Sequence, residues 1–264
     1  MKLLILGGTR FLGRHLVEAA LAKGHAVTLF NRGKSNPGLF PAIETILGDR
    51  EHNLAQLSTR RFDAVIDTCG YLPRIVRLAA QAFRETSGSY VFISSISAYA
   101  DFSQVGMTEN SPLGTIPAET VEEITGETYG PLKVLCEKAV EAEFPNRALV
   151  IRPGLIVGPY DPTVGFTYWP VRVARSGEVL CPEKPDAPVQ IVDGRDLAGF
   201  ILHLLEQKAT GAYHVTGPDY DLTLGTMLQV CKQVSGSDAN FRWAPADFLS
   251  QNNVAAWSDM PVWL

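Results

Sequence analysis

The chain has 264 residues, of which 46% are hydrophobic and 19% charged, and its formal net charge is −5. This composition is ordinary for a globular protein and excludes a largely disordered chain. The absence of a lysine- or arginine-rich run disfavours nucleic acid as a partner. No apolar run approaches the ~20 residues of a membrane span. The four widely spaced cysteines form no CxxC pair, so we expect no metal site and predict reduced thiols in a cytoplasmic protein.

In chain order, the first half alternates segments that are typical of strands and of amphipathic helices. Predicted strands cover residues 3–6, 26–30, 43–47, 63–67, 90–93 and 148–151, and predicted helices cover 11–24, 52–60, 72–85 and 131–143. Repeated β-α-β units predict an α/β fold of the Rossmann type, a doubly wound parallel sheet with helices on both faces. We expect this first domain to span residues 1–152.

After residue 152 prolines become frequent and the segments shorten. Helices are predicted at 195–207 and 224–234, with a strand at 213–215. Residues 153–264 are therefore predicted to form a smaller lobe, interleaved with the first domain, that binds the substrate. The apolar ending Pro261-Val262-Trp263-Leu264 leaves open whether the chain is truncated there.

A glycine-rich turn, residues 7–13 with the sequence GGTRFLG, joins the first strand to the first helix. Amides at a helix N-terminus attract phosphate, while Gly7 permits a tight turn and Gly13 lets helix and strand pack closely. The position between a predicted strand and a predicted helix favours a nicotinamide dinucleotide site over an ordinary strand–helix turn. The predicted cofactor contacts in this turn are Gly7, Thr9, Arg10, Phe11, Leu12 and Gly13.

Two arginines favour NADP(H) over NAD(H). Proteins that prefer NAD usually carry an acid near the end of the second strand, whereas Asn31 and Arg32 stand there and Arg10 occupies the middle of the turn. A guanidinium suits a 2′-phosphate. The alternative is that Arg32 is only a solvated loop charge.

Asp49 follows the third predicted strand. It could accept a hydrogen bond from the adenine amino group, and a plain turn aspartate is the equal alternative. Arg50, Cys69 and Ser94, near the ends of further strands, complete the cofactor contacts that we predict.

Tyr129 and Lys133 are four residues apart at a helix start, so they face the same way. An adjacent ammonium favours the phenolate, and Tyr129 is therefore predicted to move a proton at a substrate hydroxyl during hydride transfer. Ser95, at the end of the strand 90–93, could hydrogen-bond the reacting oxygen. The order of glycine turn, strand-end serine and Tyr-Lys helix is more specific than any one part. The alternative is a serine turn beside a surface tyrosine.

With these motifs and the stretches YVFISSISAYAD, YGPLK, LVIRPGLIVGP and QIVDGRDLA, the chain resembles the short-chain dehydrogenase/reductases in their extended, NAD-dependent epimerase/dehydratase branch. The resemblance covers residues 1–217. It implies catalysis by Ser95, by Tyr129 as acid/base, and by Lys133, which lowers the tyrosine pKa and binds the nicotinamide ribose. It also implies that Pro153 and Leu155 pass near the nicotinamide, and that the protein dimerises through helices 72–85 and 131–143.

The leading hypothesis is an NAD(P)-dependent oxidoreductase or epimerase that acts on a secondary alcohol or ketone, such as a sugar nucleotide. Phe166, Trp169 and Arg195 are the predicted substrate contacts, with a packed hydrophobic patch as the equal alternative for the aromatic pair. Dehydration is less favoured, because Ile96 follows Ser95 where dehydratases of this branch usually have an acid.

Three departures from the resembled branch stand out: Arg10 replaces the middle glycine, no acid ends the second strand, and the C-terminal part is short. The turn GGTRFLG also resembles an atypical subgroup that includes plant chloroplast RNA-associated proteins. An RNA-binding protein and a non-catalytic NADP-sensing regulator are therefore the alternative functions.

Overall fold

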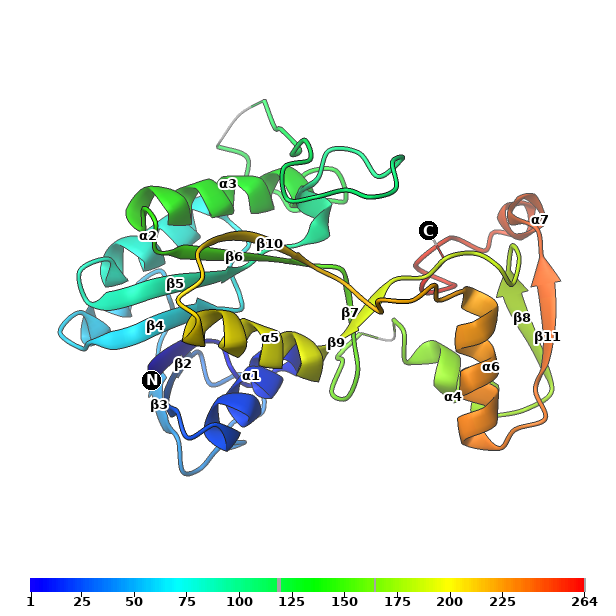
Figure 1. Ribbon diagram of the computed structural model, residues 1–264, viewed down its shortest axis with the longest axis horizontal. Helices are drawn as coiled ribbons and strands as arrows, with labels where there is room; N and C mark the ends of the chain where they lie inside the picture. The colour runs from blue at the N-terminus through cyan, green and yellow to red at the C-terminus, as the bar shows by residue number, and fades with distance from the viewer. Residues whose placement is uncertain (118–119, 164, 264) are drawn as a thin grey trace. The chain divides into compact units, whose positions relative to one another are not determined.

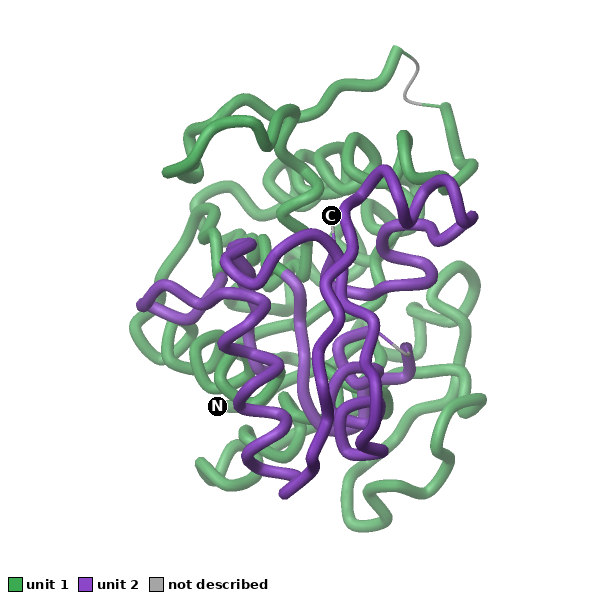
Figure 2. Tube along the Cα trace, turned by 90° about the vertical axis from the view of Figure 1, so that its right-hand side faces the viewer, with its two compact units in different colours: residues 1–154, 194–215 green, residues 155–193, 216–264 purple. Residues whose placement is uncertain are grey.

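The computed structural model describes residues 1–117, 120–163 and 165–263 (Figure 1). The chain forms two compact units, coloured separately in Figure 2. Unit 1 comprises Met1–Gly154 and Gly194–Val215, and unit 2 comprises Leu155–Asp193 and Thr216–Leu264. The chain first passes from unit 1 to unit 2 after Gly154, close to the boundary that we expected between residues 152 and 153. The segment Gly194–Val215, which we assigned to the smaller lobe, belongs to the first compact unit.

Unit 1 is built on a seven-stranded parallel sheet, with the strand order β10-β6-β5-β4-β1-β2-β3. The strands are β1 (Lys2–Leu6), β2 (Ala26–Asn31), β3 (Glu44–Leu47), β4 (Phe62–Asp67), β5 (Ser87–Ile93), β6 (Ala148–Pro153) and β10 (Gly211–Val215). The strand order reverses at β1, which lies between β2 and β4. The carboxyl ends beside this reversal are where open α/β sheets bind ligands.

Helices cover both faces of this sheet. The helices α2 (Pro73–Phe83) and α3 (Tyr129–Glu143) pack together on one face, and α1 (Phe11–Ala22) and α5 (Gly194–Glu206) pack together on the other (Figure 1). Short 3-10 turns, η1 (Leu54–Leu57) and η2 (Ile96–Ala98), follow β3 and β5. The doubly wound α/β fold predicted from the sequence is confirmed.

Continuous apolar runs explain the buried strands. Leu3, Leu4 and Ile5 are fully buried, as expected for a parallel strand covered on both faces. Large aromatic side chains fill the space between the sheet and the α2–α3 layer: Phe83, Tyr90, Phe92 and Phe144. Burying such side chains supplies most of the driving force for this packing.

Unit 2 has two pairs of parallel strands, β7 (Leu155–Val157) with β9 (Ile191–Asp193) and β8 (Glu178–Pro182) with β11 (Asn240–Ala244). Its helices are α4 (Tyr168–Ala174), α6 (Leu224–Ser235) and α7 (Ala246–Gln251), of which α4 and α6 pack together. Only α6 matches a prediction in this unit, because the other elements are too short to show a period in the sequence. Within the described residues of the chain, no helix is long and apolar enough to cross a membrane.

Candidate functional site

The glycine turn follows β1 at the point where the strand order reverses. Gly7 and Gly8 adopt positive φ values of 105° and 89°, which favour glycine. A Cβ on Gly7 would lie 2.5 Å from the Thr68 hydroxyl, and one on Gly13 would lie 3.0 Å from the backbone of Gly8. Three glycines therefore bring β1, α1 and the end of β4 into closer contact than other residues permit.

Arg10 is the N-cap residue of α1 and has an extended backbone, with φ −129° and ψ 141°. A side chain is tolerated in this conformation, which explains how arginine stands where the related pattern has glycine. No side chain caps this helix, and its first turn carries no acid. The uncapped amides of the first turn and the helix dipole make the turn suited to a pyrophosphate.

Two asparagines support the turn from outside. The Asn31 amide donates to the Gly7 carbonyl at 3.0 Å and accepts from the Gly33 amide at 2.9 Å. The Asn36 amide donates to the Thr9 carbonyl at 2.8 Å. The Asn31 amide thus supports the backbone of the turn, and its predicted contact with the cofactor stays a prediction. The neighbouring Arg32 is exposed.

Arg50, which we predicted as a cofactor contact, pairs with a buried carboxylate. Its guanidinium forms two hydrogen bonds with Asp67, at 2.8 and 2.6 Å, and Asp67 also accepts from the Tyr90 hydroxyl at 2.8 Å. Burial opposes the charge of Asp67, yet the adjacent Arg50 keeps the pKa of this carboxyl below its usual value. Because a buried carboxylate needs such a partner, Arg50 acts first as a structural counter-charge.

Cys69 and Asp49 have local partners as well. The Cys69 thiol contacts the Leu6 carbonyl and the Arg50 guanidinium, each at 3.5 Å, and burial raises its pKa to about 11. The Asp49 carboxylate accepts from the Glu51 amide at 2.9 Å, which is the geometry of a turn aspartate. The observed contacts of both residues are with neighbouring parts of the chain.

Ser95 and Tyr129 come together at the carboxyl end of β5. Ser95 caps η2, where its hydroxyl accepts from the Ser97 amide at 3.1 Å. A Cβ on Gly130 would lie only 1.9 Å from the Ser97 carbonyl oxygen. The glycine after Tyr129 therefore lets α3 begin against the serine turn.

Lys133 joins two strand ends. Its ammonium donates to the carbonyls of Gly70, at 2.8 Å, and Ile93, at 2.6 Å. Burial lowers the pKa of Lys133 to about 8. Burial raises the Tyr129 pKa, and the Ser95 side chain opposes that shift. That Lys133 lowers this pKa stays a prediction.

Tyr71 is a site residue that the sequence analysis missed. It follows Gly70 in the connection from β4 to α2, its ring centre lies 5.4 Å from the Lys133 ammonium, and it is 49% exposed. Burial of the phenol raises its pKa, and the nearby Arg10 opposes that shift. Tyr71 thus lies between the glycine turn and the Ser-Tyr-Lys group. The signal in the sequence was its place directly after a strand end.

Ser94, another predicted cofactor contact, is engaged within the protein. It is buried and donates a hydrogen bond to Glu137 of α3, whose carboxylate is paired with Arg152 at the end of β6. Glu137 and Arg152 were not predicted as site residues, and both are buried. The three side chains form a buried polar cluster.

The predicted substrate contacts separate into different environments. Trp169 is fully buried in the core of unit 2 and donates to the Pro261 carbonyl at 2.6 Å, so its predicted ligand contact is corrected to a packing role. Phe166 packs against the same core. Arg195 is exposed near the start of α5. Pro153 is buried at the end of β6, and Leu155 is partly buried in β7.

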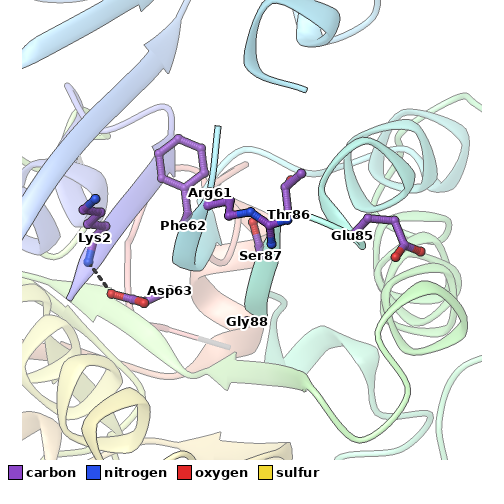
Figure 3. A pocket seen from close by; sticks show the side chains of 8 residues that line it. All are labelled: Lys2, Arg61, Phe62, Asp63, Glu85, Thr86, Ser87 and Gly88. Atoms are coloured by element: carbon purple, nitrogen blue, oxygen red, sulfur yellow. Dashed lines mark hydrogen bonds between the residues drawn. The ribbon is translucent and has the colours of Figure 1, made fainter. Parts of the chain in front are cut away.

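A hollow of about 470 Å³ lies at the opposite edge of the sheet, at the amino ends of β1, β4 and β5 (Figure 3). Its lining includes two cations, Lys2 and Arg61, and two acids, Asp63 and Glu85, so its formal charges cancel. One acid is already engaged, since Asp63 accepts from the Lys2 backbone amide at 2.6 Å. The candidate site remains at the carboxyl edge.

Residues 3–75 match the model of the NAD dependent epimerase/dehydratase family. The chloroplast stem-loop binding protein of 41 kDa b from Arabidopsis thaliana is 24% identical over 89% of this chain and 63% of its own length. A UDP-glucose 4-epimerase from Neisseria meningitidis is 30% identical over 52% of this chain and 46% of its own length. The chain thus spans less than two thirds of the length of these relatives.

Solved structures share the fold over most of the chain. The UDP-N-acetylglucosamine 4-epimerase from Bacillus cereus is 19% identical with a TM-score of 0.73, over 93% of this chain and 88% of the other. The UDP-glucuronic acid 4-epimerase from Bacillus cereus in complex with NAD is 16% identical with a TM-score of 0.74, again over 93% and 88%. The predicted resemblance is thus supported by the family match over residues 3–75, and these structures show that the fold is shared.

Proposed function

We propose that this protein is an NAD(P)-dependent oxidoreductase or epimerase that acts on a secondary alcohol or ketone of a sugar nucleotide. The observation that carries the proposal is the convergence of Ser95, Tyr129 and Lys133 at strand ends beside an uncapped glycine turn. The family match and the relatives that are named UDP-sugar epimerases support the substrate class.

The residues of the turn fit a nicotinamide dinucleotide. The glycine positions form a cradle that a Cβ would fill, and the first turn of α1 offers amides without a capping side chain. When bound, the cofactor supplies hydride transfer. The α1 N-terminus would hold its pyrophosphate, and Lys133, fixed by two carbonyls, would bind its nicotinamide ribose.

The chemical step assigns one role to each side chain. Tyr129 holds or accepts the proton of the substrate hydroxyl at its phenolic oxygen. Ser95, which opens the turn packed against the start of α3, orients the reacting oxygen. In this structure burial raises the Tyr129 pKa, so stabilisation of the phenolate must come from Ser95 and from the cations near the bound cofactor.

We further propose that NADP(H) binds more tightly than NAD(H). Arg10 at the turn and exposed Arg32 after β2 offer guanidinium groups where a ribose 2′-phosphate is expected. The UDP-glucuronic acid 4-epimerase from Bacillus cereus was solved in complex with NAD, so the two cofactors need a direct comparison on this protein. Dissociation constants for the two cofactors at equal salt measure the preference, and tighter binding of NAD(H) contradicts this part of the proposal.

The decisive test of function is the Tyr129→Phe variant. It should bind NADP(H) with unchanged affinity, because the phenol hydroxyl is not part of the turn. It should lose ~100-fold or more of the hydride transfer between bound NADP⁺ and a UDP-sugar. The panel should include UDP-glucose, UDP-N-acetylglucosamine and UDP-glucuronic acid. Unchanged transfer in the variant contradicts the assignment of Tyr129.

One comparison favours a second candidate, an RNA-binding function on the same fold, since a relative that aligns with 89% of this chain is named a stem-loop binding protein. The net charge of −5 argues against it. Retention on an RNA stem-loop at physiological salt would support this candidate.

A homodimer through α2 and α3, implied by the family resemblance, is tested by sedimentation equilibrium.

A further inference from the structure

A buried carboxylate lies two helical turns after Tyr129. Tyr129, Lys133 and Glu137 follow one another at intervals of four on α3, so they share one face of the helix. The Glu137 side chain is only 3% exposed. The chemistry proposed above assigns no role to this residue.

Glu137 is fully engaged by two partners. Arg152 donates from Nε to one carboxylate oxygen at 3.1 Å and from Nη2 to the other at 2.7 Å. The Ser94 hydroxyl donates to the same oxygen as Arg152 Nε. Arg152 also donates to the Glu109 carbonyl at 3.1 Å. A buried charge with several hydrogen bonds of fixed direction has little freedom to move.

These contacts connect the serine pair, Ser94 and Ser95, to β6 and to α3. Ser94 and Ser95 are consecutive, and the Ser94 amide donates to the Ile151 carbonyl at 2.7 Å, one residue before Arg152. Ser94 donates to Glu137 of α3, and the turn that Ser95 opens packs against the start of the same helix, where a Cβ on Gly130 would lie 1.9 Å from the Ser97 carbonyl oxygen. The serine pair is therefore held to α3 at two points, two turns apart.

We propose that Glu137 is a positioning residue of the reaction centre: its carboxylate, fixed by Arg152, holds Ser94 and thereby keeps Ser95 against Tyr129. This inference rests on the roles proposed for Ser95 and Tyr129. The active serine is thus oriented by its sequence neighbour and by the helix that also carries the tyrosine. Groups whose supporting contacts are lost drift out of the productive geometry, and a displacement of ~1 Å can cost ~100-fold in rate.

The test uses the full chain and needs no substrate. Tyrosine labelled at Cζ with ¹³C is incorporated, and the Tyr129 resonance is assigned by its loss in Tyr129→Phe. Its position at neutral pH reports the surroundings of the phenol, which include the Ser95 side chain. Ser94→Ala removes the link to Glu137 and leaves the Glu137–Arg152 pair intact, so the fold should be retained. We expect Ser94→Ala to move the resonance in the same direction as Ser95→Ala and to add nothing in the double variant.

Ser87→Ala is the matched control, since Ser87 is also a buried serine of β5, at the opposite end, and its hydroxyl has no hydrogen-bond partner among the described residues. It should leave the resonance unchanged. Glu137→Gln gives a second route to the same shift. With a UDP-sugar that is turned over, Ser94→Ala should lower kcat by ~10-fold or more and leave the KM for NADP(H) unchanged.

Two results overturn the inference: a Tyr129 resonance in Ser94→Ala that matches the wild type, or shifts of Ser94→Ala and Ser95→Ala that add in the double variant. Failure of the proposed function is a separate result, since it appears as unchanged hydride transfer in Tyr129→Phe. The resonance experiment tests Glu137 in either case.

Discussion

Gly130→Ala should separate the two halves of the proposed reaction centre. The added Cβ would lie 1.9 Å from the Ser97 carbonyl oxygen, a backbone atom that cannot rotate away. Real Cβ atoms essentially never approach closer than 3.0 Å, so the start of α3 and the serine turn must move apart by at least 1.1 Å, the difference between these two distances. Tyr129 is the adjacent residue, and its contact with Ser95 should open by a similar amount.

The expected consequences are large for chemistry and moderate for stability. A displacement of ~1 Å in a reacting group costs ~100-fold in rate, while overpacking of this kind destabilises a fold by ~1–3 kcal/mol. NADP(H) binding at the glycine turn should change little, because the turn lies at a different strand end. Hydride transfer at saturating UDP-sugar, cofactor titration and thermal unfolding measure the three quantities.

Gly199→Ala is the matched control. Gly199 also lies in a helix, α5, and a Cβ there meets nothing within 4 Å. This variant should gain up to about 1 kcal/mol, since alanine is the better helix former, and it should keep full activity. If Gly130→Ala behaves as Gly199→Ala does, the close contact between α3 and the serine turn does not exist, and the geometry argued for the site is wrong.

Three further outcomes are expected. Arg50→Met should leave Asp67 buried without its cation and cost ~3–5 kcal/mol in unfolding free energy, measured by denaturant titration; a loss as small as that of an exposed arginine, such as Arg242→Met, refutes the pairing. Burial lowers the pKa of Lys133 to about 8 from an ordinary 10.5. Between these two pH values the folded chain therefore binds fewer protons than the unfolded chain. Lys133 consequently destabilises the fold most below pH 8. The stability gained by Lys133→Met should therefore shrink as pH rises from 8 to 10.5, by up to about 3 kcal/mol, and a pH-independent difference contradicts the shift. Arg32→Ala should weaken NADP(H) binding ~10-fold and leave NAD(H) binding unchanged; equal weakening of both would show that Arg32 does not select the 2′-phosphate.

Much of the fold and part of the site were determined by the sequence alone. The apolar runs of β1, β4 and β5 and the periodicity of α1 to α3 are local signals, because both faces of a parallel strand and one face of each helix are buried. The order of glycine turn, Ser95, Tyr129 and Lys133 predicted their convergence, since parallel strands bring their carboxyl ends to one edge.

Only the tertiary structure decided which side chains of the site interact and how their pKa values shift. The pairing of Arg50 with Asp67, the anchoring of Lys133 on Gly70 and Ile93, and the raised Tyr129 pKa depend on burial and on contacts between residues far apart in sequence. The same holds for Trp169, whose aromatic neighbourhood in the sequence did not distinguish a ligand surface from a packed core. Hydrophobic pattern specifies where a strand ends, whereas the protonation and orientation of a side chain there are set by whatever the fold packs against it.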